Sequence, residues 1–167
     1  IDLEWLDNNP SNPKWASYGE MVKAIRAVVP NDKIFSVSLH PVSYTMPLDA
    51  IDAVDYVTFQ NYGPRKSSLV WSAYSSFYTT AVNYGYPAEK IRLSMATTAV
   101  MSDNSGKNVK GYKDLDFSTV TAESNTGTIG GVDYTFNGVK EVQKKMQLLV
   151  DNNTGGCMYF DMGNDVS

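Results

Sequence analysis

Apolar residues recur along the chain with two spacings, and the two spacings alternate. A spacing of two predicts a strand, and a spacing of three or four predicts a helix. In the opening stretch IDLEW, Ile1, Leu3 and Trp5 share one side of a predicted strand, while Asp2 and Glu4 share the other. The same reasoning predicts further strands at 33–41, 55–63, 91–100 and 155–165, and helices at 14–30, 47–54, 68–85 and 137–153.

Strands that alternate with helices predict a parallel sheet joined by right-handed crossovers. Residues 102–137 interrupt this order, because they are polar and rich in Gly, Asn, Ser and Thr, and we expect a loop excursion that carries a hairpin. The strands fit either an open doubly wound sheet or part of a (β/α)8 barrel, which typically needs ~250 residues. Because the chain opens within a strand, we expect residues 1–167 to be the C-terminal part of a barrel. They would supply strands four to eight, with an insertion before the last helix, and the first three β/α units would be absent from this sequence.

Composition narrows the class of protein. The chain is 43% hydrophobic and 19% charged, and no segment approaches the ~18 apolar residues of a membrane span. Its net charge of −4 argues against a nucleic-acid partner, and the short basic clusters Arg65-Lys66 and Lys144-Lys145 are expected on solvated faces. The single cysteine, Cys157, excludes an intrachain disulfide. Eleven Tyr, three Trp and six Phe residues favour carbohydrate binding, since sugar faces stack on aromatic rings.

In parallel β/α proteins the reactive groups gather at the carboxyl ends of the strands. Asp2 and Glu4 lie there, ~6.6–7 Å apart at Cα if the strand is regular. Two carboxylates held side by side in a partly dry pocket repel, so that one keeps its proton near neutral pH and can act as a general acid. The alternative is two acids on a solvent-facing strand. Gln60 and Tyr62 repeat the spacing on another strand and suit a neutral polar substrate such as an amide.

IDLEW resembles the end of the D-x-x-D-x-D-x-E signature of glycoside hydrolase family 18, the chitinases and endo-β-N-acetylglucosaminidases. This alignment places Asp2 on the last aspartate and Glu4 on the catalytic glutamate. A second register would place Glu4 on the last aspartate and Leu6 on the catalytic position, and D-x-E favours the first. Three later stretches resemble strands and helices of the same family in the same order: DYVTFQNYG, YGYPAEKIRLSM and TFNGVKEVQKKMQLLVDNNTGGCMYFDMGND.

The resemblance implies retaining, substrate-assisted hydrolysis of β-1,4 bonds next to N-acetylglucosamine, in chitin, chitooligosaccharides or the chitobiose core of N-glycans. It implies that Glu4 is the acid and base, that Asp2 orients the acetamide and that Tyr62 bonds the acetamide oxygen. Gln60 would help to hold the acetamide. Phe160 would stack under the sugar in place of the family's tryptophan. No metal or organic cofactor is implied.

Two further residues end predicted strands at the same edge. His40, the only histidine, could contact substrate, but it has no neighbouring Cys, Asp or His with which to bind a metal. Asp161 could line the site or hold the end of its strand. TTAV replaces the family's usual aromatic turn after strand seven, and together with Phe160 it argues against a typical processive chitinase.

Two other functions remain open. The first is an inactive, lectin-like sugar binder of the same fold, which retention of Glu4 argues against. The second is an unrelated doubly wound binding protein, which would need a glycine-rich phosphate loop after a strand. GTIGG (127–131) lies in the insertion and reads as a turn instead. Activity is expected to need the absent N-terminal half of the barrel, and the substrate implies a secreted, periplasmic or cell-surface protein.

Overall fold

The computed structural model describes residues 2–3, 6–121 and 123–165. Five parallel strands form the main sheet, in the order β1-β2-β3-β4-β9. This spatial order follows the order of the chain without a reversal. A doubly wound sheet reverses its strand order at a switch point, whereas a barrel does not. The fold is therefore part of a (β/α)8 barrel, as the sequence predicted. The strands are β1 (Asp2–Leu3), β2 (Ser36–Leu39), β3 (Tyr56–Phe59), β4 (Ile91–Ala96) and β9 (Gly156–Phe160).

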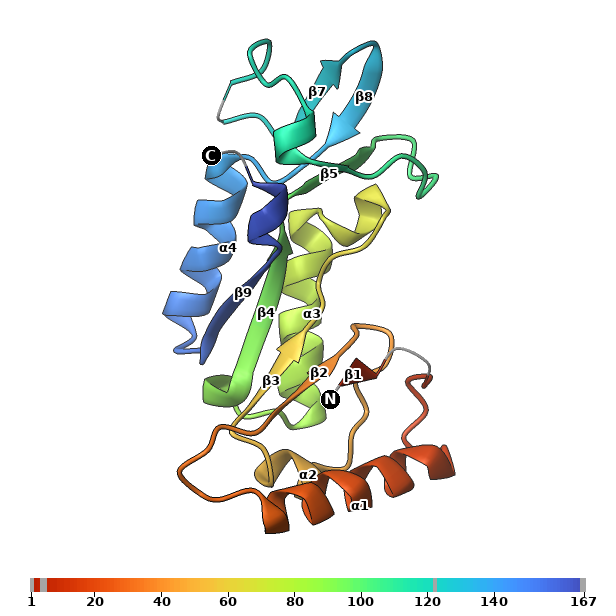
Figure 1. Ribbon diagram of the computed structural model, residues 1–167, viewed down its shortest axis with the longest axis vertical. Coiled ribbons are helices and arrows are strands. Elements are labelled where there is room, and N and C mark those ends of the chain that lie inside the picture. Colours follow the sequence, from red (N-terminus) through yellow and green to blue (C-terminus); the bar gives the residue numbers. More distant parts are fainter. Residues whose placement is uncertain (1, 4–5, 122, 166–167) are drawn as a thin grey trace.

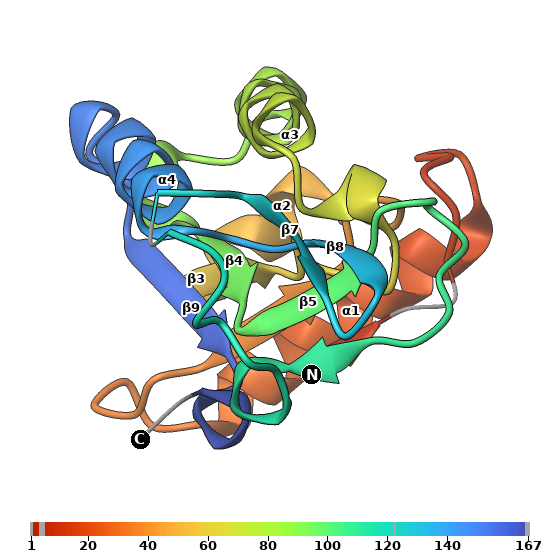
Figure 2. The same ribbon diagram turned by 90° about the horizontal axis from the view of Figure 1, so that it is seen from above.

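Within residues 2–3, 6–121 and 123–165, four α-helices pack along one side of the sheet (Figure 1). Figure 2 shows α3 and α4 next to each other outside the sheet. Pro13 begins the first helix at a position where proline costs no hydrogen bond, and Gly85, with φ of 124°, ends the third. None of the helices in the described part of the chain is both long and apolar enough to cross a membrane. The helices are α1 (Pro13–Val28), α2 (Leu48–Asp52), α3 (Trp71–Tyr84) and α4 (Val139–Asp151).

The main core lies between the sheet and the helices. Strand β4 is buried along nearly its whole length, as a central parallel strand should be. In the helices, Trp15, Val22 and Tyr74 are almost fully buried. Met21 and Val139, in contrast, are 41% and 50% exposed.

The insertion forms a second, antiparallel sheet with strand order β6-β5-β8-β7 and stands at the carboxyl ends of the barrel strands (Figure 1). The single strand predicted at 91–100 is wrong, because the chain leaves the barrel sheet at Thr97 and β5 pairs within the insertion. The hairpin and the glycine turn are confirmed: Gly130 and Gly131 have φ of 59° and 78° between β7 and β8. The strands are β5 (Thr98–Met101), β6 (Lys110–Gly111), β7 (Thr126–Ile129) and β8 (Val132–Thr135).

Of the four residues in the two basic clusters, three are at least partly exposed and one is buried. Arg65 and Lys144 are exposed, as predicted. Lys145, in contrast, is only 2% exposed, so its prediction on a solvated face is wrong. The reason is helical geometry: Lys145 lies three residues after Val142 and four before Leu149, on the face of α4 that packs against the barrel.

Candidate active site

Two aromatic rings from different strands meet at the carboxyl edge of the sheet. Tyr62 follows the end of β3, and Phe160 is the last residue of β9. Their rings are stacked, with centroids 4.9 Å apart and an interplanar angle of 8°. Strand β4 lies between their two strands in the sheet, so the ring pair bridges the end of β4. Phe160 remains 46% exposed, so the pair offers an aromatic surface at this edge.

Thr97, the residue at which the chain leaves β4, binds the backbone carbonyl groups of Phe160 and Asp161. The Thr97 backbone N–H donates to the Phe160 carbonyl oxygen (3.1 Å), and its hydroxyl donates to the Asp161 carbonyl oxygen (2.5 Å). The Asp161 carboxylate accepts from the Asn164 side-chain amide (3.1 Å), within the short turn that follows β9. The Asn164 backbone N–H also donates to the Asp161 carbonyl oxygen (3.0 Å), so these contacts of Asp161 all lie at the end of its strand.

Gln60 connects the ends of β2 and β3. Its side chain is 5% exposed, and its amide donates to the Ser38 hydroxyl (2.9 Å). Ser38 is also in register with Asp2 in the neighbouring strand β1. One strand, β2, therefore separates Gln60 from the strand that carries the predicted acidic pair. Glu4 lies outside the described residues, and the structure describes Asp2 only as a backbone position.

His40 lines the same recess as Gln60 and Tyr62. This pocket has a volume of about 160 Å³, with Tyr74 and Phe77 also among its lining residues. It would hold about five water molecules at ~30 Å³ each and is smaller than the ~300 Å³ of a typical small-molecule site. In the part of the chain that is described, no three His, Cys, Asp or Glu side chains gather in a metal-binding arrangement.

Sequence reasoning missed two features of this region: the contact between Tyr62 and Phe160, and a buried network around Lys145 and Asn137. No local pattern indicates the first, because it depends on how strand ends converge. The second had a signal in the helical period of α4, which places position 145 inward.

Comparison with known proteins assigns the fold. No protein-family model matches the chain, and no curated protein matches it significantly. Solved structures do match: the GH18 chitinase ChiB from Flavobacterium johnsoniae is 18% identical, with a TM-score of 0.72 over 99% of this chain and 54% of its own. The chitinase-like agglutinin from Robinia pseudoacacia is 15% identical, with a TM-score of 0.75 over 99% of this chain and 63% of its own. A GH18 chitinase from Cycas revoluta, solved in complex with (GlcNAc)3, is 12% identical, with a TM-score of 0.67 over 98% of this chain and 63% of its own.

These matches confirm the resemblance at the level of the fold: the protein has the partial barrel of the GH18 chitinases and chitinase-like proteins. The chain spans between half and two thirds of the length of these structures. Since the matched proteins include both chitinases and an agglutinin, the shared fold does not by itself assign an activity, and the chemistry has to be argued from the residues of the site.

Proposed function

We propose that this protein hydrolyses β-1,4 glycosidic bonds next to N-acetylglucosamine. The observation that supports the proposal most is the convergence of Gln60, Tyr62 and Phe160 at one edge of the barrel, where Gln60 also bonds Ser38, the residue in register with Asp2. An aromatic surface beside a buried amide suits a sugar that carries an acetamide group, because the ring face packs on the aromatic surface and the amide is hydrogen-bonded.

The proposed reaction is substrate-assisted and retains the anomeric configuration. Protonated Glu4 donates its proton to the glycosidic oxygen while the acetamide oxygen of the substrate attacks the anomeric carbon and the bond to the leaving sugar breaks. Asp2 orients the acetamide N–H and offsets the positive charge that develops on the resulting oxazolinium ring. Glu4, now a carboxylate, takes a proton from water as that water attacks the anomeric carbon and reopens the ring. Every group returns to its starting state.

Tyr62, Gln60 and Phe160 position the substrate in this scheme. The Tyr62 hydroxyl donates to the acetamide oxygen and aligns it for attack. One face of the Phe160 ring is covered by Tyr62, so the sugar packs on the exposed remainder. His40 and Asp161 lie at the margin of the site, where His40 contacts a neighbouring sugar and the Asp161 carboxylate, bonded to Asn164, holds the end of β9.

The barrel needs further β/α units for this activity. In the described part of the chain β9 pairs only with β4, and its last residues, Tyr159 and Phe160, are exposed. A groove of about 480 Å³ runs between α4 and β9 and is lined mainly by apolar side chains, including Val142 and Met162. Exposed strand edges and apolar grooves of this size are normally covered. The remaining units of the barrel would cover both, and an enzyme that acts on polymeric chitin would act outside the cell.

The test is turnover of chitotetraose and of an N-glycan by the full-length protein, its Glu4→Gln variant and its Glu20→Gln variant as a surface control. We expect release of shorter sugars by the wild type, a loss of about 10²–10⁴-fold in Glu4→Gln and no change in Glu20→Gln. Equal rates for Glu4→Gln and wild type would contradict the role of Glu4. Binding of chitotetraose by the wild type without turnover would overturn the hydrolase proposal and favour a lectin.

A further inference from the structure

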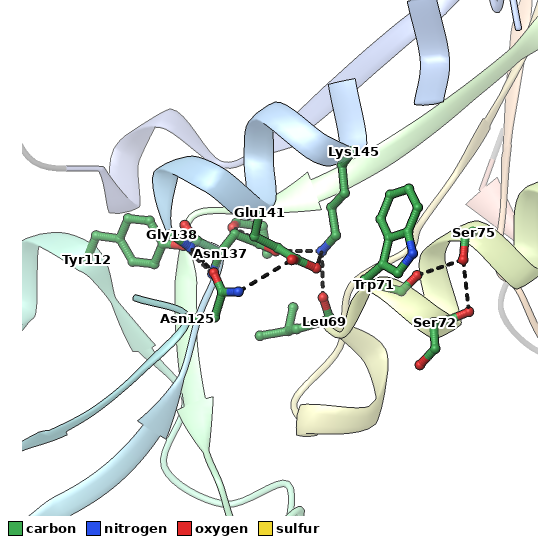
Figure 3. Close-up of polar contacts among 11 residues, drawn as sticks. Leu69, Trp71, Ser72, Ser75, Tyr112, Asn125, Asn137, Gly138, Glu141 and Lys145 are labelled. Carbon is green, nitrogen blue, oxygen red and sulfur yellow. Dashed lines mark hydrogen bonds and ion pairs between the residues drawn. The ribbon is translucent and has the colours of Figure 1, made fainter. Parts of the chain in front are cut away.

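A buried ammonium group lies at the junction between the barrel and its insertion (Figure 3). The Lys145 amine donates to the backbone carbonyl of Leu69 and to the side-chain oxygen of Asn137 (2.6 Å). A carboxylate oxygen of Glu141, one turn earlier in α4, lies 3.7 Å away. The three N–H donors of the ammonium thus face three oxygen acceptors.

Burial of an ammonium group costs desolvation free energy, which is unexpected for a side chain that only fills space in the core. A buried charge needs complete pairing, and apolar residues of similar volume often replace such a group without loss of stability. Burial lowers the pKa of Lys145 to about 8, although Glu141 opposes the shift. Unlike a leucine side chain, the amine makes directional hydrogen bonds to two separate segments of the chain. The residues that accept these hydrogen bonds therefore indicate its role.

Asn137, the first residue that Lys145 binds, is connected to Phe160 through the end of β4. Asn137 is 6% exposed. Its side-chain amide donates a second hydrogen bond, to the carbonyl oxygen of Ala96, the last residue of β4 (3.1 Å). Ala96 is in register with Phe160 in β9. The next residue, Thr97, bonds the Phe160 carbonyl directly. A displacement of Asn137 would therefore be transmitted to the backbone that carries the Phe160 ring.

Leu69, the second residue that Lys145 binds, is connected to Tyr62 by packing. Leu69 is 2% exposed and packs with Ala96 and Val100, and the ring of Tyr62 packs against this small cluster. The carbonyl that Lys145 binds belongs to this same leucine. One amine therefore holds the segment behind each of the two stacked rings.

We infer that Lys145 is a positioning residue for the Tyr62–Phe160 ring pair, acting through Leu69 on one ring and through Asn137 on the other. The geometric part of this inference stands on the contacts alone. Its consequence for catalysis rests on the proposed function, in which the ring pair receives the sugar.

The geometric part is tested by NMR on full-length protein with labelled phenylalanine. The stack shifts the Phe160 ring protons upfield, and Tyr62→Leu gives the unstacked reference. We expect Lys145→Met and the milder Lys145→Gln to lose most of this shift while the rest of the spectrum stays folded. Lys144→Met is the matched control, since Lys144 is exposed, lies over the ring of Trp71 and makes no contact with this network. Retention of the full shift in a folded Lys145 variant would overturn the inference. If neither Lys145 variant folds, Asn137→Ala, which breaks the path to Phe160 alone, gives the same readout.

The catalytic part is tested by a double-mutant cycle. Lys145→Met is expected to lower kcat/KM for chitotetraose about 10- to 100-fold in wild-type protein, since small misplacements of positioning groups have effects of this size. In a Tyr62→Leu background, where the stack is already lost, the same substitution should change kcat/KM less than about twofold. Equal losses in both backgrounds would indicate a general structural role and contradict positioning. If the wild type shows no turnover at all, the proposed function fails, whereas the ring-proton measurement still decides the inference.

Discussion

Tyr62 and Phe160 form a stacked pair across the end of β4, with ring centroids 4.9 Å apart. The sequence suggested separate tasks for the two residues, a hydrogen bond to the acetamide for one and a sugar platform for the other. Because the two rings are in contact, each ring helps to hold the other in place. Substitutions at the two positions should therefore affect each other, and the hydroxyl of Tyr62 can be separated experimentally from its ring.

Tyr62→Phe removes the hydroxyl and leaves the stack intact. We expect kcat/KM for chitotetraose to fall about 10- to 100-fold, because an interaction made with the acetamide oxygen in the transition state is lost. The thermal midpoint should stay near that of the wild type, since the ring still packs against Leu69. Unchanged kcat/KM would mean that the hydroxyl does not contact the reacting group.

Changing the size of the side chain at position 160 should change the affinity of the protein for GlcNAc oligomers. Phe160→Ala removes the exposed ring, and we expect the dissociation constant for a GlcNAc oligomer to rise about 10-fold, since an aromatic contact of this kind contributes ~1–2 kcal/mol. Phe160→Trp should bind more tightly than the wild type. Calorimetry in the inactive Glu4→Gln background measures both, and an affinity that is the same in all three proteins would exclude Phe160 as the platform.

The titration of Lys145 should make stability depend on pH in a defined direction. Its pKa is about 8 in the folded protein and about 10.4 in an unfolded chain, so between these values the unfolded state binds more protons. The free energy of unfolding contributed by Lys145 should therefore rise from pH 8 to pH 10, by about 1–3 kcal/mol.

The groups near Lys145 would not hide this effect. Glu141, Tyr74 and Cys157 are present in both proteins compared, and burial raises the pKa values of Tyr74 and Cys157. Their contributions are shared by wild type and Lys145→Met, so the difference between the two proteins isolates the lysine. Chemical denaturation at several pH values measures this difference. A difference that stays flat or falls with rising pH would contradict the burial of the amine.

Gly155 tests the packing at the start of β9. A Cβ atom added there would lie 2.2 Å from the backbone carbonyl oxygen of Glu89, which cannot move aside as a side-chain tip could. We expect Gly155→Ala to lower the free energy of unfolding by about 1–3 kcal/mol. Glu89→Ala is the matched control, because it alters the exposed side chain of the same contact and leaves the carbonyl in place. Equal stability of Gly155→Ala and the control would contradict the close approach.

The regular part of the fold could be predicted because local patterns determine it. Sequence pattern identified strands such as the one predicted at 55–63, which contains β3, and Val57 and Phe59 of that strand are both buried. The change of sheet at Thr97 could not be predicted, because TTAV continues a β-forming pattern and only tertiary pairing divides it. Lys145 was misassigned because its charge was weighed above its helical position. The polar residues at the strand ends were found from the parallel β/α rule, and the predicted roles of Asp2 and Glu4 remain predictions.

The anomeric form of the first product is the most direct measurement of the proposed chemistry. Full-length protein is mixed with chitotetraose in an NMR tube, and the anomeric protons of the new reducing end are followed before mutarotation. Participation of the substrate's acetamide at the site near Tyr62 predicts that the β-anomer forms first and that oligomers without acetyl groups are not cut. An initial α-anomer, or equal cleavage of deacetylated oligomers, would contradict it.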